Sequence, residues 1–240
     1  MAKRVARAVS PRTRKAAPAP SSPQLPARRP AKPAAQARDP GPAAQTAGMQ
    51  LYTPEGARKY LTAAERDTFL AVAGRTDRDI HTLCMTLAYS GCRLSEALAL
   101  TADRVDLGAG TVVFESLKKR RDGIYRAVPV PPALLTALVM AHGVRELQAK
   151  RGRGQGLRLW PWSRMTGWRA VHGVMMAAGL DGPHASPKGL RHGFGVAAVS
   201  AGIPLNLVQK WLGHAQLSTT AIYADAIGPE EQDIASRMWG

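Results

Sequence analysis

The composition of the chain changes abruptly near residue 48, and this change limits what can fold. Residues 1–48 consist mainly of Ala, Pro, Arg and Ser, with nine prolines and almost no large apolar side chains. Such a segment cannot bury enough apolar surface to offset the entropy that is lost on ordering. We therefore expect residues 1–48 to be a disordered basic arm and the folded domain to begin at residue 49.

The charge of the chain is strongly basic, with 33 Lys and Arg against 17 Asp and Glu and a net charge of +16. Residues 1–48 hold ten of the basic residues and one acid, Asp39, so they carry +9 and the rest carries +7. A basic surplus favours a polyanionic partner, most simply nucleic acid. The arm itself fits a DNA-contacting segment or a solvated linker, whereas its prolines argue against a mitochondrial transit peptide.

Several classes of protein are disfavoured by what the sequence lacks. The chain has no run of 18 apolar residues that would form a transmembrane helix, and no apolar segment follows its basic N-terminus as in a signal peptide. Cys84 and Cys92 lie in an apolar segment and resemble small core residues, which fits a reducing cytoplasm. No His or Cys cluster has the spacing of a zinc site, so we expect neither a metal nor another cofactor.

Apolar spacing predicts an α+β domain over residues 49–228, mainly helical with one small antiparallel sheet. Thr62 and Glu65 form the pattern of a capping box at the start of the first helix. A turn at 121–123 separates two predicted strands, 111–114 and 124–128. Further helices are predicted at 79–89, 93–98, 133–144, 166–179, 189–201, 204–213 and 217–225, followed by a tail at 229–240 that can form a last short helix.

Tyr223 is a candidate nucleophile for attack on a phosphodiester. A free tyrosine has a pKa of about 10 and is a poor nucleophile at neutral pH. Guanidinium groups near it would favour the phenolate and would hold the charge of the transition state. The alternative is a tyrosine that packs at a helix edge with its hydroxyl in water.

Arg93 and Arg191 are the candidate phosphate ligands, because a planar guanidinium donates two parallel hydrogen bonds to phosphate oxygens. The alternative for Arg93 is an ordinary ion pair with Glu96 at i,i+3. Both roles are compatible if Glu96 orients Arg93.

His214 and a lysine pair complete the candidate chemistry. His214 follows Leu212-Gly213 on a predicted turn, from which it could donate to phosphate; the alternative is a helix-end histidine. Lys118 and Lys119 follow the first predicted strand, and a lysine there could protonate the leaving 5′ oxygen. The alternative is a solvated basic turn over residues 118–121.

Together these segments resemble the catalytic domain of the tyrosine recombinase (phage integrase) family, over roughly residues 55–227. Residues 90–98, with Arg93, resemble the first arginine box of that family, and Leu190-Arg191-His192 resembles the second. Residues 211–214 resemble the histidine box and residues 219–223 the nucleophile box. Lys118 fits the hairpin lysine, with Lys119 as the alternative.

The resemblance implies the fold of the DNA breaking-rejoining enzymes and a site-specific DNA recombinase. Tyr223 would attack the scissile phosphate to form a 3′-phosphotyrosine and free a 5′ hydroxyl, without ATP or a metal. The protein would act in the cytoplasm, encoded by a bacterium, phage or plasmid, in integration, excision or resolution of a mobile element or plasmid.

The resemblance also implies partners: double-stranded DNA, and a homotetramer on two DNA sites that exchanges a C-terminal segment between subunits. Here that segment would be residues 229–239, where Ile234, Met238 and Trp239 form an apolar side.

Two features depart from the family pattern. Lys188 occupies the position of a usual histidine and is a weaker base for the tyrosine proton. His184 and His192 are therefore kept as supporting or alternative residues, as are Glu96 and Lys119. Residues 1–48 are also too short and polar for the helical core-binding domain of the family, so we expect the arm or an accessory DNA-binding protein to supply that grip.

Two rival functions remain open. A type IB topoisomerase shares the tyrosine chemistry but needs no second duplex, and the four boxes disfavour it. A non-catalytic DNA-binding regulator of the same fold is favoured by Lys188 and by the short N-terminal segment, whereas Arg93, Arg191, His214 and Tyr223 argue against it.

Overall fold

The computed structural model describes residues 50–116, 123–150, 156–225, 235–236 and 238–239. The chain divides into two compact units, Met1–Asp39 and Pro40–Gly240, and the first lies wholly outside the described residues. The predicted arm, Lys118, Lys119 and most of the tail 229–240 also lie outside them. Within the described residues, no helix combines the length and the apolar character that crossing a membrane requires.

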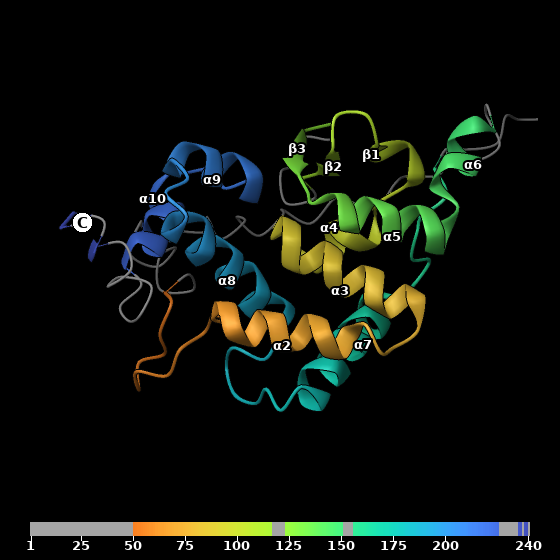
Figure 1. Ribbon diagram of the computed structural model, residues 1–240. Coiled ribbons are helices and arrows are strands. Elements are labelled where there is room, and N and C mark those ends of the chain that lie inside the picture. Colours follow the sequence, from red (N-terminus) through yellow and green to blue (C-terminus); the bar gives the residue numbers. More distant parts are fainter. Residues whose placement is uncertain (1–49, 117–122, 151–155, 226–234, 237, 240) are drawn as a thin grey trace, which may run out of the picture. The chain divides into compact units, whose positions relative to one another are not determined.

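Helix α3 (Arg78–Ser90) forms the centre of the main core. Its residues from Thr82 to Ala88 are all buried, and they include Cys84, which like Cys92 is a free, buried core residue as predicted. The helix contacts α2 (Ala63–Ala73), α5 (Pro132–His142), α7 (Arg164–Ala177) and α8 (Pro187–Ser200). Figure 1 shows α5 on one side of α3, and α2 and α7 on the other.

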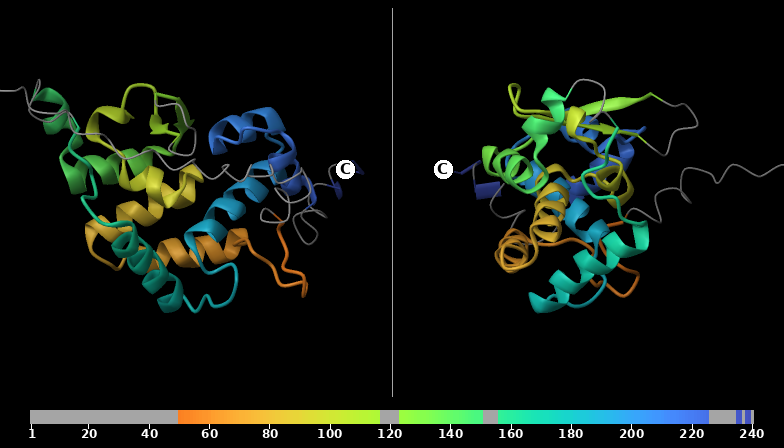
Figure 2. Two further views of the ribbon diagram at one scale, coloured as in Figure 1. Left: turned by 180° about the vertical axis from the view of Figure 1, so that it is seen from behind. Right: turned by 90° about the vertical axis from the view of Figure 1, so that its right-hand side faces the viewer.

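Three antiparallel strands form the sheet, in the order β1 (Val105–Asp106), β2 (Thr111–Glu115) and β3 (Tyr125–Pro129). Strands β2 and β3 confirm the predicted pair, and Phe114 lies opposite Arg126 in their register. Strand β1 was not predicted, because two residues after a 3-10 turn, η1 (Ala102–Arg104), are too short to show an alternating pattern. The sheet lies on the α5 side of the unit, away from α2 and α7 (Figures 1 and 2).

Glycines in the left-handed conformation end two helices, α5 and α3. The helix predicted over 133–144 is present as α5 but ends two residues earlier, because Gly143 adopts a left-handed φ of 60° and separates it from a further helix that was not predicted, α6 (Val144–Ala149). Gly91 ends α3 in the same way with a φ of 59°, so that the short helix α4 (Leu94–Leu98) starts in a new direction.

The C-terminal helices enclose a second apolar cluster. It contains Tyr60 from the segment before α2, Val196 from α8, Val208 and Leu212 from α9 (Leu205–Leu212), and Tyr223. The predicted helix over 217–225 is instead a short α10 (Ser218–Ala221) followed by a 3-10 turn, η2 (Ile222–Asp225). The elements that carry or precede Arg191, His214 and Tyr223 therefore meet at this second cluster.

Candidate active site

Arg93 lies at the start of α4, where Glu96 holds it at two points. The carboxylate of Glu96 accepts the backbone N–H of Arg93 at 2.8 Å and its Nη1 at 2.6 Å. Glu96 is only 2% exposed. Burial alone would raise the pKa of Glu96, but the guanidinium groups of Arg126 and Arg93 hold it below the usual value. The predicted i,i+3 contact is therefore present, and the carboxylate is ionised.

Arg191 lies on α8 and connects the two halves of the site. Its Nη1 donates to the carbonyl oxygen of Gly91 at 2.8 Å, and its Nη2 donates to that of Leu212 at 2.7 Å. Burial lowers the pKa of Arg191 to about 10, with Arg93 acting in the same direction, so the side chain stays cationic at neutral pH. One buried cation thus joins the end of α3 to the end of α9.

Both arginines open into one hollow of about 460 Å³. Lys188, which is exposed, and His192, which is buried, also line it. Two further lining residues, Arg164 and Trp168, were not predicted from the sequence. They are four residues apart on α7 and so lie on one face of that helix, which is the pattern that could have identified them. The remaining residues of the rim are small or apolar: Leu94, Ser95, Ser186 and Pro187.

His214 follows Gly213, whose φ of 67° ends α9 and turns the chain back toward the site. Nδ1 of His214 lies 2.9 Å from Oγ1 of Thr220, and its Nε2 is buried without a hydrogen-bond partner among the described residues. Burial lowers the pKa of His214 to about 3, and Arg191 and Arg93 add to this, so the ring is neutral at neutral pH. If the hydroxyl of Thr220 donates to Nδ1 of the neutral ring, Nε2 carries the ring proton. This Nε2–H then has no acceptor among the described residues.

Tyr223 is a buried residue in this structure, with only 1% of its surface exposed. Its hydroxyl lies 3.3 Å from Nδ1 of His192, and its ring stacks on that of His214 with a centroid distance of 6.2 Å. A Cβ at Gly195 would come within 2.6 Å of the tyrosine ring, so α8 leaves room for it only because that position is a glycine. The alternative of a hydroxyl in water is therefore not what the structure shows.

The pKa of Tyr223 differs from the expectation. Burial raises it to about 12, and Arg191 and Arg93 lower it only in part. The predicted effect of the guanidinium groups is present, but the loss of hydration outweighs it. In this arrangement the tyrosine is a neutral phenol.

The alternative histidines have different neighbours. His192 contacts the tyrosine hydroxyl, as described above. His184 precedes α8, and its Nε2 lies 3.6 Å from Oε1 of Glu65. Each carboxylate oxygen of Glu65 also accepts a hydrogen bond from Arg58 at 2.6 Å. The structure thus brings His192 rather than His184 to the candidate nucleophile.

Arg126 is a buried cation beside the site that sequence reasoning took only as part of a strand. It is 6% exposed and donates to Glu96 and to the carbonyl oxygen of Trp211. The strand pattern could have identified it, because Arg126 and Val128 are two residues apart and so share one face of β3, which is the buried face. A charged side chain on a buried face needs a partner. Together with His214, Arg126 lines a smaller hollow of about 210 Å³ beside the end of the β2–β3 pair at which Ser116 and Ile124 lie.

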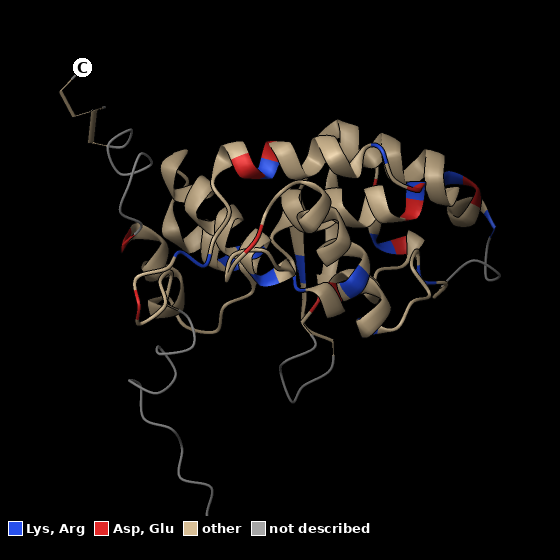
Figure 3. Ribbon diagram, turned by 90° about the horizontal axis from the view of Figure 1, so that it is seen from below, with Lys and Arg blue, Asp and Glu red and all other residues tan. Residues whose placement is uncertain are grey.

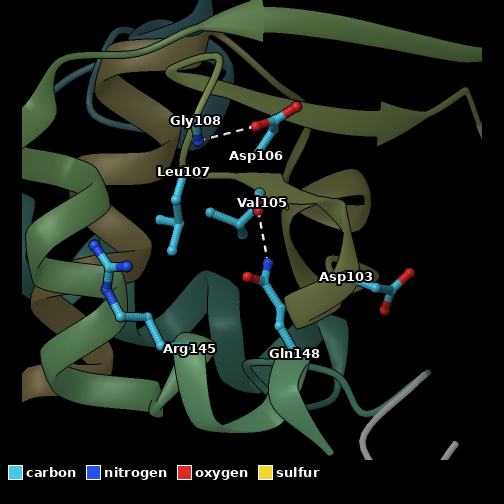
Figure 4. Close-up of a pocket in the computed structure, with 7 residues that line it drawn as sticks. All are labelled: Asp103, Val105, Asp106, Leu107, Gly108, Arg145 and Gln148. Atoms are coloured by element: carbon cyan, nitrogen blue, oxygen red, sulfur yellow. Dashed lines mark hydrogen bonds between the residues drawn. The ribbon is translucent and has the colours of Figure 1, made fainter. Parts of the chain in front are cut away.

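A separate hollow of about 480 Å³ lies between the β1 turn and α6 (Figure 4). Oδ1 of Asp106 accepts the backbone N–H of Gly108 at 3.0 Å, and Nε2 of Gln148 donates to the carbonyl oxygen of Val105 at 2.7 Å. These polar groups stabilise the turn and hold α6 against it, and no predicted site residue lines the hollow. Among the described residues, no group of three or more His, Cys, Asp or Glu side chains is placed to hold a metal ion.

The order of these segments along the chain matches that of a known family. The sequence model described as "Phage integrase family" matches residues 59–227. The chain belongs to the phage integrase family. All the elements from α2 to η2 lie within the matched range, and so do the predicted arginine, histidine and tyrosine boxes.

The chain is similar in sequence to a curated recombinase and in structure to solved recombinases and integrases. Tyrosine recombinase XerD of Mycobacterium tuberculosis is 35% identical over 150 residues, which are 58% of this chain and 45% of that protein. XerH site-specific recombinase, bound to palindromic difH substrate in a post-cleavage complex, matches with a TM-score of 0.61 and 25% identity over 81% of this chain and 55% of that one. The catalytic domain of bacteriophage HP1 integrase matches with a TM-score of 0.53 and 21% identity, over 74% and 93% of the two chains.

The match confirms the predicted family and the fold class, a mainly helical domain with a small antiparallel sheet. The part of XerD that this chain matches is about half of the length of that protein. The range that the family model matches, residues 59–227, contains Arg93, Arg191, His214 and Tyr223.

Proposed function

We propose that this chain is a tyrosine-type site-specific DNA recombinase that cuts and rejoins DNA through a covalent 3′-phosphotyrosine. One observation carries the proposal: the hydrogen bonds of Arg191 draw together the segments that contain Arg93 and His214, and Tyr223 packs against His214 at the same place. Four residues that are far apart in the sequence thus meet in the combination that phosphoryl transfer requires.

The cationic groups suit a phosphate in the hollow of Arg93 and Arg191. Two guanidinium groups can hold the non-bridging oxygens, and the charge that grows on them in the transition state strengthens these hydrogen bonds. The neutral His214 offers Nε2–H as a further donor that costs no buried positive charge. The site therefore stabilises a pentavalent phosphorus by fixed donors.

In the proposed reaction Oη of Tyr223 attacks the phosphorus, the bond to the 5′ oxygen breaks, and that oxygen receives a proton and leaves as a hydroxyl. The attack of a 5′ hydroxyl from the partner duplex on the phosphotyrosine reverses these bond changes and rejoins the strands. Because the phosphotyrosine conserves the energy of the broken bond, no ATP is consumed. Lys118, or Lys119 in its place, is proposed as the donor of the proton; both lie outside the described residues.

The phenolic proton of Tyr223 passes to His192 in this proposal, because Nδ1 of His192 is in contact with the hydroxyl. Burial and the nearby cations Lys188 and Arg191 lower the pKa of His192 to about 3 in the free protein. A bound phosphate would offset those positive charges and make the ring more basic when the reaction occurs. The tyrosine must also turn out of its buried position to reach DNA, since its hydroxyl is enclosed here.

Double-stranded DNA is the proposed partner. Residues 156–225 contain six Lys and Arg side chains and two acidic ones, and Figure 3 shows where the basic positions lie on the ribbon. The XerH relative is bound to its difH substrate, which supports the same class of ligand for this chain. A positive surplus on the catalytic part attracts the DNA backbone independently of its sequence.

The larger assembly is also a proposal. Residues 49–228 would act as the catalytic domain, and residues 1–48, or an accessory protein, would contact DNA beside it. Four copies would assemble on two DNA sites in the bacterial cytoplasm, each passing residues 229–240 to a neighbour. Met238 and Trp239 are 80% and 79% exposed, as side chains that dock on another subunit would be. Movement of a mobile element or resolution of a plasmid is the proposed biological role.

The decisive experiment is a trapping assay with nicked duplexes tiled across the DNA that flanks the gene. Cleavage near a nick releases a short fragment, so religation fails and the covalent complex accumulates. We expect an adduct that survives denaturation in the wild-type protein and is absent in Tyr223→Phe, which differs by one oxygen atom. A recombinase of known site serves as the positive control for trapping.

Two outcomes would contradict the proposal. DNA binding that is indifferent to Tyr223→Phe, with no adduct from the wild-type protein, would favour the non-catalytic regulator. An adduct accompanied by relaxation of supercoiled DNA without any defined site would favour the topoisomerase-like activity.

A further inference from the structure

Arg126 occupies a position between the two halves of the active site. It lies on the buried face of β3, and its guanidinium group is 5.4 Å from the ring centroid of Phe114 on β2. Arg126 is 30 residues from Glu96 and 85 residues from Trp211 in the sequence, yet it bonds to both. A residue with both bonds can fix the position of one half of the site relative to the other.

Toward the N-terminal half, Arg126 acts on Glu96. Its Nη2 donates to Oε2 of Glu96 at 2.6 Å, while Oε1 of the same carboxylate accepts Nη1 of Arg93 at 2.6 Å. The two arginines therefore share one carboxylate, with one oxygen each for their side chains. Removal of Arg126 would leave Glu96 held by Arg93 alone, through its backbone N–H and its Nη1, and would remove the contact that fixes the pair of Arg93 and Glu96 relative to the sheet and to α9.

Toward the C-terminal half, Arg126 acts on the end of α9. Its Nε donates to the carbonyl oxygen of Trp211 at 2.7 Å, next to the Leu212 carbonyl that accepts from Arg191. Carbonyl groups in the last turn of a helix lack partners within the helix, and cations there are stabilising. A Cβ at Gly213 would lie 3.2 Å from three atoms of Arg126, so the turn that leads to His214 packs directly on the guanidinium group.

We propose that Arg126 is a positioning residue that sets Arg93, through Glu96, and His214, through the end of α9, at a fixed separation for the same phosphate. This inference rests on the proposed recombinase function. A lysine cannot replace Arg126, because a single ammonium group does not present two donors in a rigid plane. A small change in the placement of reacting groups is sufficient to slow catalysis about 100-fold.

The test compares DNA affinity with the single-turnover cleavage rate, using the full chain and a nicked duplex that yields an adduct with the wild-type protein. We expect Arg126→Ala and Arg126→Lys to bind that duplex within about threefold of wild type and to cleave it about 100-fold more slowly. Methylguanidinium added to Arg126→Ala should restore part of the rate. The rate losses of Arg126→Ala and Glu96→Gln should not multiply in the double variant, because both act through one network.

Arg104→Ala is the matched control. Arg104 also pairs with a carboxylate of the sheet, Glu115 at 3.0 Å, and it lies over the ring of Tyr125. Arg104 lines neither the hollow of Arg93 and Arg191 nor that of Arg126 and His214. We expect wild-type cleavage from Arg104→Ala and no response to methylguanidinium. If Arg126→Ala loses the cooperative unfolding transition of the wild-type protein, Arg126→Lys decides the same question.

The proposal is overturned if a folded Arg126→Lys or Arg126→Ala variant cleaves at the wild-type rate. It is also overturned if affinity and cleavage fall by the same factor, since that result describes general damage to the fold. These results leave the wild-type adduct intact and so differ from a failure of the recombinase proposal, in which the wild-type protein forms no adduct and the positioning role falls with it.

Discussion

His192 and Lys188 are one helical turn apart on α8 and compete for the same role at the scale of single residues. Lys188 has the sequence position at which the family usually places histidine, but it is an exposed side chain in the hollow. His192 is buried, and its Nδ1 is within 3.3 Å of the tyrosine hydroxyl. Proximity therefore favours His192 as the partner of the nucleophile.

The corresponding prediction concerns the cleavage rate. We expect His192→Asn, whose amide can still bond to the hydroxyl but cannot accept its proton, to lower single-turnover cleavage by roughly 100-fold. Lys188→Ala should have a smaller effect on that rate and should mainly weaken DNA binding, because its ammonium group lines the hollow. The measurement is adduct formation against time at saturating protein. Unchanged cleavage by His192→Asn together with a large loss in Lys188→Ala would reverse the assignment.

At the scale of elements, the start of α2 combines a local cap with a longer-range ion pair. Thr62 and Glu65 form the capping box that the sequence predicted. Glu65 also pairs with Arg58 and lies beside His184, in the loop that precedes α8. The cap of α2 therefore helps to hold the helix that carries Arg191 and His192.

This arrangement predicts a pH-dependent stability. The hydrogen bond from Arg58 lowers the pKa of Glu65 from the usual value near 4.5 to about 2. The depressed pKa means that the stabilisation is complete above about pH 4.5 and is lost as the pH falls toward 2. We expect Glu65→Gln to reduce the free energy of unfolding by about 1 kcal/mol at pH 7, because solvent screens a partly exposed ion pair.

Urea unfolding of the wild-type protein and Glu65→Gln between pH 7 and pH 3 measures this difference. Their free energies of unfolding should converge as the solution becomes more acidic. Asp67→Asn is the control, because it changes an exposed charge on the same helix and should shift stability little at any pH. A gap between wild type and Glu65→Gln that is constant with pH would contradict the role of the ionised carboxylate.

At the scale of the whole molecule, the net charge of the chain is divided between the arm and the rest. Residues 1–48 carry +9 of the total of +16. If the arm contacts DNA, its cations displace counterions from the phosphate backbone, and this contribution falls as salt concentration rises.

Deletion of residues 1–48 should therefore weaken DNA binding at low salt and flatten the dependence of log Kd on log salt concentration. Each phosphate that the arm neutralises should account for about 0.9 of the difference in slope. Binding curves at several salt concentrations measure the slope, and thermal unfolding of both proteins checks that residues 49–240 are unaffected. Equal slopes with and without the arm would show that the arm is a solvated linker.

The sequence alone determined those features that depend on neighbours in the chain. The capping box of Thr62 and Glu65 and the pair of Arg93 and Glu96 each join residues three positions apart, so helical geometry is enough to predict them. The paired strands β2 and β3 follow from alternation around a turn. The order of the boxes also led to the correct family, because residue types at fixed places in the chain are visible without a structure.

Only the tertiary structure decided the contacts between distant segments and the effects of burial. Arg126 on β3 reaches Glu96 on α4 and Trp211 on α9 because of how these elements pack. His192 on α8, rather than His184, reaches Tyr223 on η2 for the same reason. Burial also reversed the expected shift of the tyrosine pKa, since the hydration lost by the hydroxyl outweighs two nearby guanidinium groups. The candidate reacting groups can be named from short segments of this chain, whereas their orientation and charge state depend on side chains and solvent that only the folded molecule brings together or excludes.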